Sequence, residues 1–187
     1  MLYFAYGSCM DKRDFRRTCK SAVMVDSDAV LVDHTLRFDL YSAGRRGGVA
    51  NIRRKKGSVV RGVLYWIPDP AETAALDRRE GAPFVYRRQK VTVMVQGKTV
   101  EVVTYVGRRT LGYEIAPSAE YAGTVLRGIR DAEYREQVER HINQLGCAQL
   151  GVECHGFSND LSNKDWVAAG GRSARQIVQK ATWSHAP

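Results

Sequence analysis

The stretch MLYFAYGSCMDKRDF, residues 1–15, places three kinds of local structure in direct succession. Its apolar start predicts a strand, Gly7 and Ser8 predict a turn, and the charged residues from Asp11 predict a short helix to Thr18. In this order, several backbone N–H groups can point at one place, which suits a carboxylate or a phosphate. The simpler interpretation is that Gly7 only serves the turn and Ser8 only caps the helix.

The length of 187 residues is enough for one domain with a substantial core and an appendage. The 29 Lys and Arg residues outnumber the 20 Asp and Glu residues, so the net charge is +9. This charge favours contact with anions, and the cluster Arg53-Arg54-Lys55-Lys56, which we expect in a β-turn, is the natural place for a nucleic acid. We do not expect nucleic acid as the partner, because exposed cations also serve solubility and edge protection.

The sequence contains no sign of a membrane segment. No uninterrupted apolar run approaches the roughly 20 residues that a membrane span needs, and residues 1–6 are too short and lack the basic start of a signal peptide. We therefore expect a cytoplasmic protein. We also expect no metal, since the cysteines and nearby histidines match no common zinc spacing; the set is Cys9, Cys19, His141, Cys147, Cys154 and His155.

Strand patterns dominate the first two thirds of the chain. Alternating apolar residues predict strands at residues 34–41 and 59–67, and the runs 85–95 and 99–106 predict a hairpin around Gln96-Gly97-Lys98. With the opening run, we expect about six strands in all. Between the first two lies a glycine-rich segment, residues 42–52, in which we expect a flexible turn that carries Arg45 and Arg46.

Capping signals define the helices. Asp69-Pro70 and Glu72 predict the start of a helix that runs through Glu80 and ends at Gly81. Ser118 predicts a helix over residues 119–129, and Asp131 predicts another that ends before Gly146. Strands and helices without βαβ alternation indicate an α+β fold with an antiparallel or mixed sheet, curled into a barrel.

Glu80 is an unusual choice for the last turn of a helix, where the macrodipole disfavours a carboxylate by about 0.3–1 kcal/mol. If Phe84, Tyr86 and strand residues surround the carboxyl, its pKa is raised, as in an acid/base catalyst. The alternative is a solvated Glu80 paired with Arg78 or Arg79. Cys9 with His34 as a base would be a second kind of catalyst, although a small apolar filler is the simpler role for Cys9.

Several motifs together resemble the γ-glutamylcyclotransferase family, whose fold the plant AIG2-like proteins share. They are YFAYGSCM, GGVANI followed by GVLYWI, LDRREGAPFVYRRQKVTV and PSAEY, in the family's order and spacing from Leu2 to about Leu145. The resemblance implies residues 1–145 as a γ-glutamylcyclotransferase-like domain, a mixed and largely antiparallel β-barrel with packed helices. Residues 146–187, rich in glycine, are then a C-terminal appendage of uncertain order.

The resemblance also implies the parts of a site. Glu80 is the expected acid/base catalyst, and the substrate carboxylate is expected on the backbone amides of Tyr6, Gly7, Ser8, Cys9 and Met10. Tyr86, Tyr105 and Tyr121 are expected to line the pocket, with no cofactor and no metal. The family loop commonly has Asn followed by Leu where this chain has Cys9 and Met10. Because a thiol is a much weaker hydrogen-bonding partner than an amide, this departure bears on the substrate.

The predicted activity is the conversion of a small-molecule γ-glutamyl amide to 5-oxoproline and the free amine, as in glutathione metabolism. Ring closure uses the substrate's own α-amine as nucleophile, so the protein must supply positioning and proton transfer. Three alternatives stay open: a related γ-glutamyl or acyl-amine transferase or hydrolase, a non-catalytic relative that binds a small carboxylate, and a polyanion- or nucleic-acid-binding protein. A homodimer is the assembly that we consider.

Overall fold

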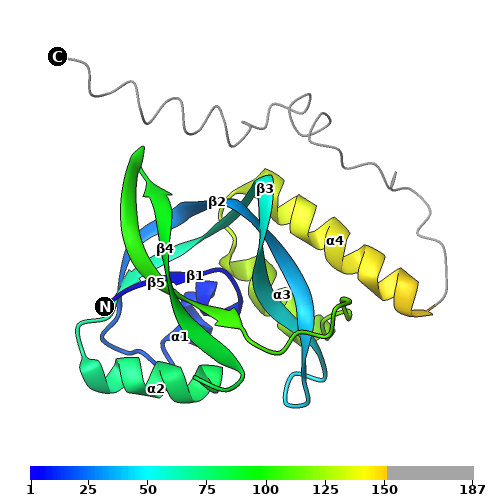
Figure 1. Ribbon diagram of the computed structural model, residues 1–187, viewed down its shortest axis with the longest axis horizontal. Coiled ribbons are helices and arrows are strands. Elements are labelled where there is room, and N and C mark those ends of the chain that lie inside the picture. The colour runs from blue at the N-terminus through cyan, green and yellow to red at the C-terminus, as the bar shows by residue number, and fades with distance from the viewer. Residues whose placement is uncertain (151–187) are drawn as a thin grey trace.

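The computed structural model describes residues 1–150. In chain order, the strands are β1 (Leu2–Ala5), β2 (Val23–Ser42), β3 (Gly47–Trp66), β4 (Tyr86–Val95) and β5 (Lys98–Gly107). The helices are the short 3-10 turn η1 (Ser8–Met10), α1 (Lys12–Phe15), α2 (Pro70–Glu80), α3 (Ala119–Gly128) and α4 (Ala132–Leu150). Figure 1 shows the strands curled around a common interior, with α2 beneath them and α3 and α4 at one side.

The strands form a closed barrel in the order β1-β3-β2-β4-β5. Neighbours along this order are antiparallel, and the barrel closes where β1 lies parallel to β5 at Tyr3 and Val103. Thr104 and Tyr6 reinforce this closure, since the Thr104 hydroxyl donates to the Phe4 carbonyl at 2.8 Å and the Tyr6 hydroxyl donates to the Tyr105 carbonyl. The predicted α+β barrel is therefore confirmed.

Local signals place several elements as expected. Asp69 caps α2 through the Ala71 N–H, and Gly81 ends the helix in the left-handed conformation with φ +61°. The two residues Gln96 and Gly97 connect β4 to β5, both with positive φ, as a tight hairpin requires. Ser118 and Asp131 accept backbone N–H bonds at the starts of α3 and α4.

Several expectations about element bounds are wrong. The barrel has five strands where we expected about six, and residues 47–52, expected as part of a turn, belong together with residues 59–66 to the single strand β3. Its partner β2 starts at Val23, and register shifts along this long pair interrupt the alternation that would have revealed it. The first helix is shorter than residues 11–18, since Asp11 is its N-cap and the helix ends at Phe15.

The basic cluster Arg53-Arg54-Lys55-Lys56 lies within β3, which corrects its expected place in a β-turn between strands. The register shifts from His34 opposite Arg54 to Val32 opposite Val59, so the strand carries a bulge here in which Gly57 has φ +80°. The flexible turn is likewise shorter than expected, because Gly47 and Gly48 already belong to β3.

Helix α4 continues through Gly146 to Leu150, so its expected end before Gly146 is also wrong. The predicted division into residues 1–145 and 146–187 stays a prediction, because residues 151–187 lie outside the described part of the chain.

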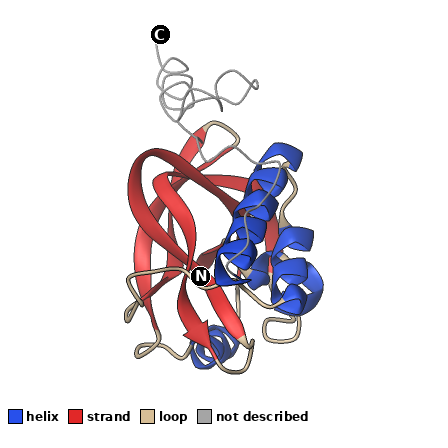
Figure 2. Cartoon of the chain, turned by 90° about the vertical axis from the view of Figure 1, so that its right-hand side faces the viewer, coloured by secondary structure: helices blue, strands red, loops and turns tan. Residues whose placement is uncertain are grey.

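The core fills the barrel and the seam beneath the helices, with large side chains such as Phe4, Phe38, Tyr65 and Leu76 almost fully buried. Figure 2 shows the helices gathered along one side of the barrel and beneath it. None of the helices in residues 1–150 is both long enough and apolar enough to span a membrane.

Candidate active site

The turn after β1 presents its backbone to a pocket. Residues Ser8–Met10 form one 3-10 turn, closed by the Met10 N–H to the Gly7 carbonyl at 3.0 Å and the Asp11 N–H to the Ser8 carbonyl at 3.1 Å. The preceding N–H groups of Gly7, Ser8 and Cys9 have no acceptor within residues 1–150. They are the free donors that a short helical turn leaves at its start, and an anion can accept them.

Gly7 is the position in the loop that tolerates no side chain easily. A Cβ there would lie 3.1 Å from the Ala50 Cβ and 3.4 Å from the Tyr121 hydroxyl, both of which belong to the same pocket. The φ of Gly7 is −117°, which any residue can adopt. Glycine is therefore needed for space beside the pocket.

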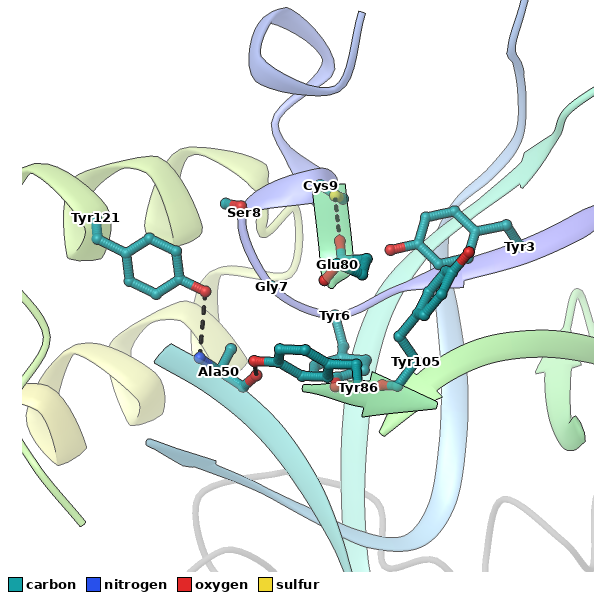
Figure 3. Close-up of a pocket in the computed structure, with 10 residues that line it drawn as sticks. All are labelled: Tyr3, Tyr6, Gly7, Ser8, Cys9, Ala50, Glu80, Tyr86, Tyr105 and Tyr121. Atoms are coloured by element: carbon teal, nitrogen blue, oxygen red, sulfur yellow. Dashed lines mark hydrogen bonds between the residues drawn. The ribbon is translucent and has the colours of Figure 1, made fainter. Parts of the chain in front are cut away.

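Helix α2 brings Glu80 to this loop. Its last residue is Glu80, and the Cys9 thiol donates to the Glu80 Oε1 at 3.6 Å (Figure 3). Arg79 fastens the same helix end to the loop region, because it donates to the Ser8 Oγ at 3.3 Å and forms an ion pair with Asp14. Two residues that are about seventy positions apart in sequence are thus held at one place.

Burial raises the pKa of the Glu80 carboxyl above its ordinary value of 4.5, against the opposing effects of the Arg79 charge and the Cys9 hydrogen bond. Glu80 as a whole is only half-buried, so the pocket keeps access to water. Phe84 does not contribute to this burial as we expected, since it is 77% exposed. A carboxyl with a raised pKa and access to a pocket can both accept and return a proton.

Cys9 is a neutral thiol in this setting. Its residue is buried, and burial together with the nearby Glu80 carboxylate raises the pKa of the thiol far above its ordinary value of 9.0. His34 lies in β2, where its Nδ1 is 2.8 Å from the Val32 carbonyl oxygen, and does not line the pocket. The arrangement does not support a thiolate nucleophile, because a nucleophilic cysteine needs a lowered pKa.

Tyrosines form most of the remaining pocket wall. Tyr86 donates its hydroxyl to the Ala50 carbonyl at 2.7 Å, and the Tyr121 hydroxyl accepts the Ala50 N–H at 3.2 Å. The proton of the Tyr121 hydroxyl has no acceptor in the described part of the chain, so it is free to donate to a ligand. Figure 3 shows Tyr121 on one side of Glu80, and Tyr3 with Tyr105 on the other.

Asp77 orients one of these tyrosines from outside the pocket. Its Oδ1 accepts the Tyr105 hydroxyl at 2.7 Å, while Arg88 pairs with both carboxylate oxygens. These hydrogen bonds outweigh desolvation and lower the pKa of the Asp77 carboxyl. Residues 76–80 of α2 therefore combine several roles within one and a half turns of helix. Leu76 is buried in the core, Asp77 binds Tyr105, Arg79 binds the loop at Ser8, and Glu80 lines the pocket.

The structure brings together all of the predicted site residues except one. The pocket is lined by Tyr3, Tyr6, Gly7, Ser8, Cys9, Ala50, Glu80, Tyr86, Tyr105 and Tyr121. Met10 is instead buried where α3 packs closely on the loop at Gly128. Sequence reasoning missed Tyr3 and Ala50. A tyrosine in an otherwise apolar strand was a weak signal for Tyr3. Ala50 gave no signal in the sequence, because it contributes only its backbone N–H and carbonyl.

The space between these residues is small, at about 40 Å³. A single water needs roughly 10–15 Å³ by the same measure, so the cavity accepts the head of a small polar ligand. Within residues 1–150, no three His, Cys, Asp or Glu side chains gather as a metal site would require. The expectation of a site without metal or cofactor stays a prediction.

Comparisons with known proteins agree on one family. Residues 3–123 match the family described as "Gamma-glutamyl cyclotransferase, AIG2-like". The chain is 34% identical over 150 residues to "Putative gamma-glutamylcyclotransferase YkqA" of Bacillus subtilis (strain 168), a match that covers 76% of this chain and 52% of that protein. The chain thus spans about half the length of this curated relative.

Solved structures give the same picture. The crystal structure of YkqA matches with a TM-score of 0.64 and 32% identity, over 78% of this chain and 55% of YkqA. A solved gamma-glutamyl cyclotransferase matches with a TM-score of 0.68 and 24% identity, over 90% of this chain and 98% of the other. The second likeness is in fold, since its identity is lower.

Proposed function

Because the chain belongs to the gamma-glutamyl cyclotransferase, AIG2-like family, we propose that it is an enzyme that converts a γ-glutamyl amide to 5-oxoproline and a free amine. The observation that supports this most is the meeting of Glu80 with the loop of free N–H groups, at 3.6 Å from the Cys9 Sγ. The pocket therefore has a proton carrier beside an anion-binding backbone. Its small volume fits a glutamyl head, with the amine portion outside.

The α-carboxylate of the glutamyl group is assigned to the loop. The N–H groups of Gly7, Ser8 and Cys9 are the free donors, and Tyr6 supports the turn through its bond to the Tyr105 carbonyl. Backbone amides recognise a carboxylate without a charged side chain, so replacing the family's Asn by Cys9 leaves this contact intact. Met10 supports the loop by packing between it and α3.

Glu80 is assigned as the general acid/base. As a carboxylate it takes a proton from the substrate α-ammonium, and the freed amine attacks the γ-carbonyl carbon to close a five-membered ring. As a carboxylic acid it then gives that proton to the leaving nitrogen while the bond from the γ-carbon to that nitrogen breaks. The ring nitrogen loses its second proton to the released amine. The step therefore balances, because one ammonium and one amide become one neutral lactam and one ammonium.

The tyrosines are assigned to the walls and to the developing charge. When the ring closes, the γ-carbonyl oxygen becomes an oxyanion that needs hydrogen-bond donors already in place. Tyr121 supplies one, since its hydroxyl is fixed by the Ala50 N–H and its proton is free. Tyr86 and Tyr105 are fixed by bonds to Ala50 and Asp77, so they shape the pocket.

The test is the release of 5-oxoproline from a panel of γ-glutamyl amides by the purified chain, with products identified by mass. Ring formation and simple hydrolysis differ by one water, so the same measurement separates a cyclotransferase from a hydrolase, and a γ-glutamyl acceptor product would indicate a transferase. Glu80→Gln should remove the activity. The matched control is Glu101→Gln, which changes a glutamate of β5 that is paired with Lys90 on the exposed surface. Full activity in Glu80→Gln would reject the catalytic assignment.

A further inference from the structure

Arg45 stands at the edge of the pocket on the turn between β2 and β3. Its guanidinium carbon lies 5.4 Å from the centroid of the Tyr121 ring, over the ring face. Its side chain is 35% exposed, whereas Tyr121 itself is buried. A cation on an aromatic face is held in place while its N–H groups stay available, and Arg45 is therefore a preorganised donor beside the pocket wall.

The guanidinium has no hydrogen-bonding partner among the residues described. Its Nη2 is 3.7 Å from the Asp14 Oδ2, which is an ion pair but too long for a hydrogen bond. Asp14 is already engaged, since Arg79 makes the closer contact with the same oxygen. The guanidinium groups of Arg45 and Arg79 thus share the single carboxylate of Asp14. Because Arg79 is the closer partner, the charge of Arg45 is only partly compensated.

The contacts around the pocket favour the side of Tyr121 for the rest of a bound ligand. On the side of Tyr3 and Tyr105, the pocket wall is part of the hydrophobic core. Tyr3 stacks on Phe15 at 5.7 Å between ring centroids and packs edge-on against Tyr105 at 5.8 Å. On the other side of Glu80 lie Tyr121 (Figure 3) and, against its ring, the half-exposed Arg45. The part of a ligand that does not fit the small cavity therefore extends past Tyr121.

We propose that Arg45 binds a carboxylate on the leaving amine, so that the preferred substrates are γ-glutamyl amino acids and peptides with an acidic group on the leaving side. This inference rests on the proposed function, which leaves the amine open. The loop takes the glutamyl α-carboxylate, and Arg45 takes the second one at the pocket mouth. A guanidinium with free paired N–H groups suits a carboxylate in two-pronged geometry.

The test compares two substrates that differ in one charge: γ-glutamyl-alanine and γ-glutamyl-alaninamide. The purified full chain, Arg45→Gln, Arg45→Lys and the control Arg46→Gln are assayed for the release of 5-oxoproline, and kcat/KM is compared between the two substrates. Arg46 is the exposed neighbour on the same turn, with no ion pair within residues 1–150. We expect the unmodified chain to prefer the acid over the amide roughly tenfold, the size of one good charge-assisted contact.

Arg45→Gln should abolish that preference, Arg45→Lys should retain part of it, and Arg46→Gln should leave it unchanged. An unchanged preference in Arg45→Gln would overturn the assignment, and so would an equal fall for both substrates, since Arg45 would then act on the shared glutamyl part. Cyclisation of the amide with no preference in the unmodified chain overturns this inference alone. Absence of 5-oxoproline from every substrate overturns the proposed function as well.

Discussion

The two ends of helix α2 carry the same residue type in opposite settings. Glu72 lies in the first turn, where its carboxylate accepts the N–H groups of Lys20 and Ser21 at 2.8 and 2.9 Å and the Ser21 hydroxyl at 2.8 Å. Glu80 lies in the last turn, inside the pocket, where a thiol at 3.6 Å is the hydrogen-bond donor. Each end also has a buried free cysteine nearby, Cys19 at the first and Cys9 at the second.

The difference teaches how the fold separates stability from chemistry. At the first turn the macrodipole and the N–H groups favour the charged carboxylate, so Glu72 joins two segments of the chain. At the last turn the macrodipole and burial both disfavour the charge, and the pKa of Glu80 is raised. A carboxyl whose ionised form is disfavoured contributes little to stability but can exchange a proton readily.

The strongest way to break this comparison is to neutralise each carboxyl in turn. Glu80→Gln should lower kcat by about 10²–10⁴-fold, the range for loss of a general acid/base. Glu72→Gln should keep kcat within about twofold, because it touches no pocket residue. Steady-state 5-oxoproline release measures both. Comparable losses in the two variants would mean that Glu80 acts through the fold.

The pH dependence of stability gives a second test. The pKa of Glu80 is raised in the folded chain above its ordinary 4.5, so the folded state binds the proton more tightly than the unfolded state. Its stabilising contribution is complete below the unfolded pKa and is lost as pH rises through the folded pKa, by about 1.36 kcal/mol for each unit of difference.

The free energy of unfolding of the unmodified chain relative to Glu80→Gln should therefore fall from acid towards neutral pH. Urea denaturation at several pH values measures this difference. A difference that does not change with pH would show that Glu80 titrates as it does in an unfolded chain.

A third, smaller effect is the change in stability at neutral pH, where we expect Glu72→Gln to be destabilised and Glu80→Gln not to be. Glu72→Gln should lose about 1 kcal/mol, since the amide oxygen can still accept the Lys20 and Ser21 N–H groups but the NH2 group that replaces Oε2 cannot accept the Ser21 hydroxyl. The melting temperature should fall by roughly 2–4 °C. Glu80→Gln should be no less stable than the unmodified chain at neutral pH. Thermal denaturation compares the two variants with the unmodified chain. A melting temperature of Glu80→Gln below that of the unmodified chain would contradict the view that the Glu80 carboxylate does not stabilise the fold.

The smallest expected effect concerns the thiol that donates to Glu80. This bond favours the carboxylate, so Cys9→Ala should raise the pKa of Glu80 further and shift the acidic limb of the kcat/KM profile to higher pH by roughly 0.5–1 unit. Cys9→Ser keeps a donor and should restore the limb. A loss of activity in both variants without a shift of the limb would indicate that Cys9 only fills space.

The sequence predicted the elements whose signals are local. Helix α2 is recognisable in full, since Asp69 and Pro70 start it and Gly81 must adopt a left-handed conformation to end it. The full lengths of β2 and β3 could not be recognised from the sequence, because bulges interrupt their alternation and Asp33 and Gly57 have positive φ within them. Period-two patterns do not survive such bends.

The site shows the same division. Glu80 and the loop after β1 follow from the motif and its resemblance, and the structure places them together. Ala50, which contributes its backbone N–H and carbonyl, and Tyr3 could not be found, because their roles arise only from how distant strands pair. The expected wall residue Phe84 is exposed, since neighbouring positions in sequence need not face the same side.

The closure of β1 on β5 has a consequence for the order in which the protein can be made. The loop that we propose for the substrate carboxylate lies within the first ten residues, yet the strand before it completes the barrel only when Val103 and Thr104 pair with Tyr3 and Phe4. About a hundred residues must therefore be added after this loop before the pocket can form around it. Such long-range pairing slows folding, and activity should appear late and all at once during synthesis.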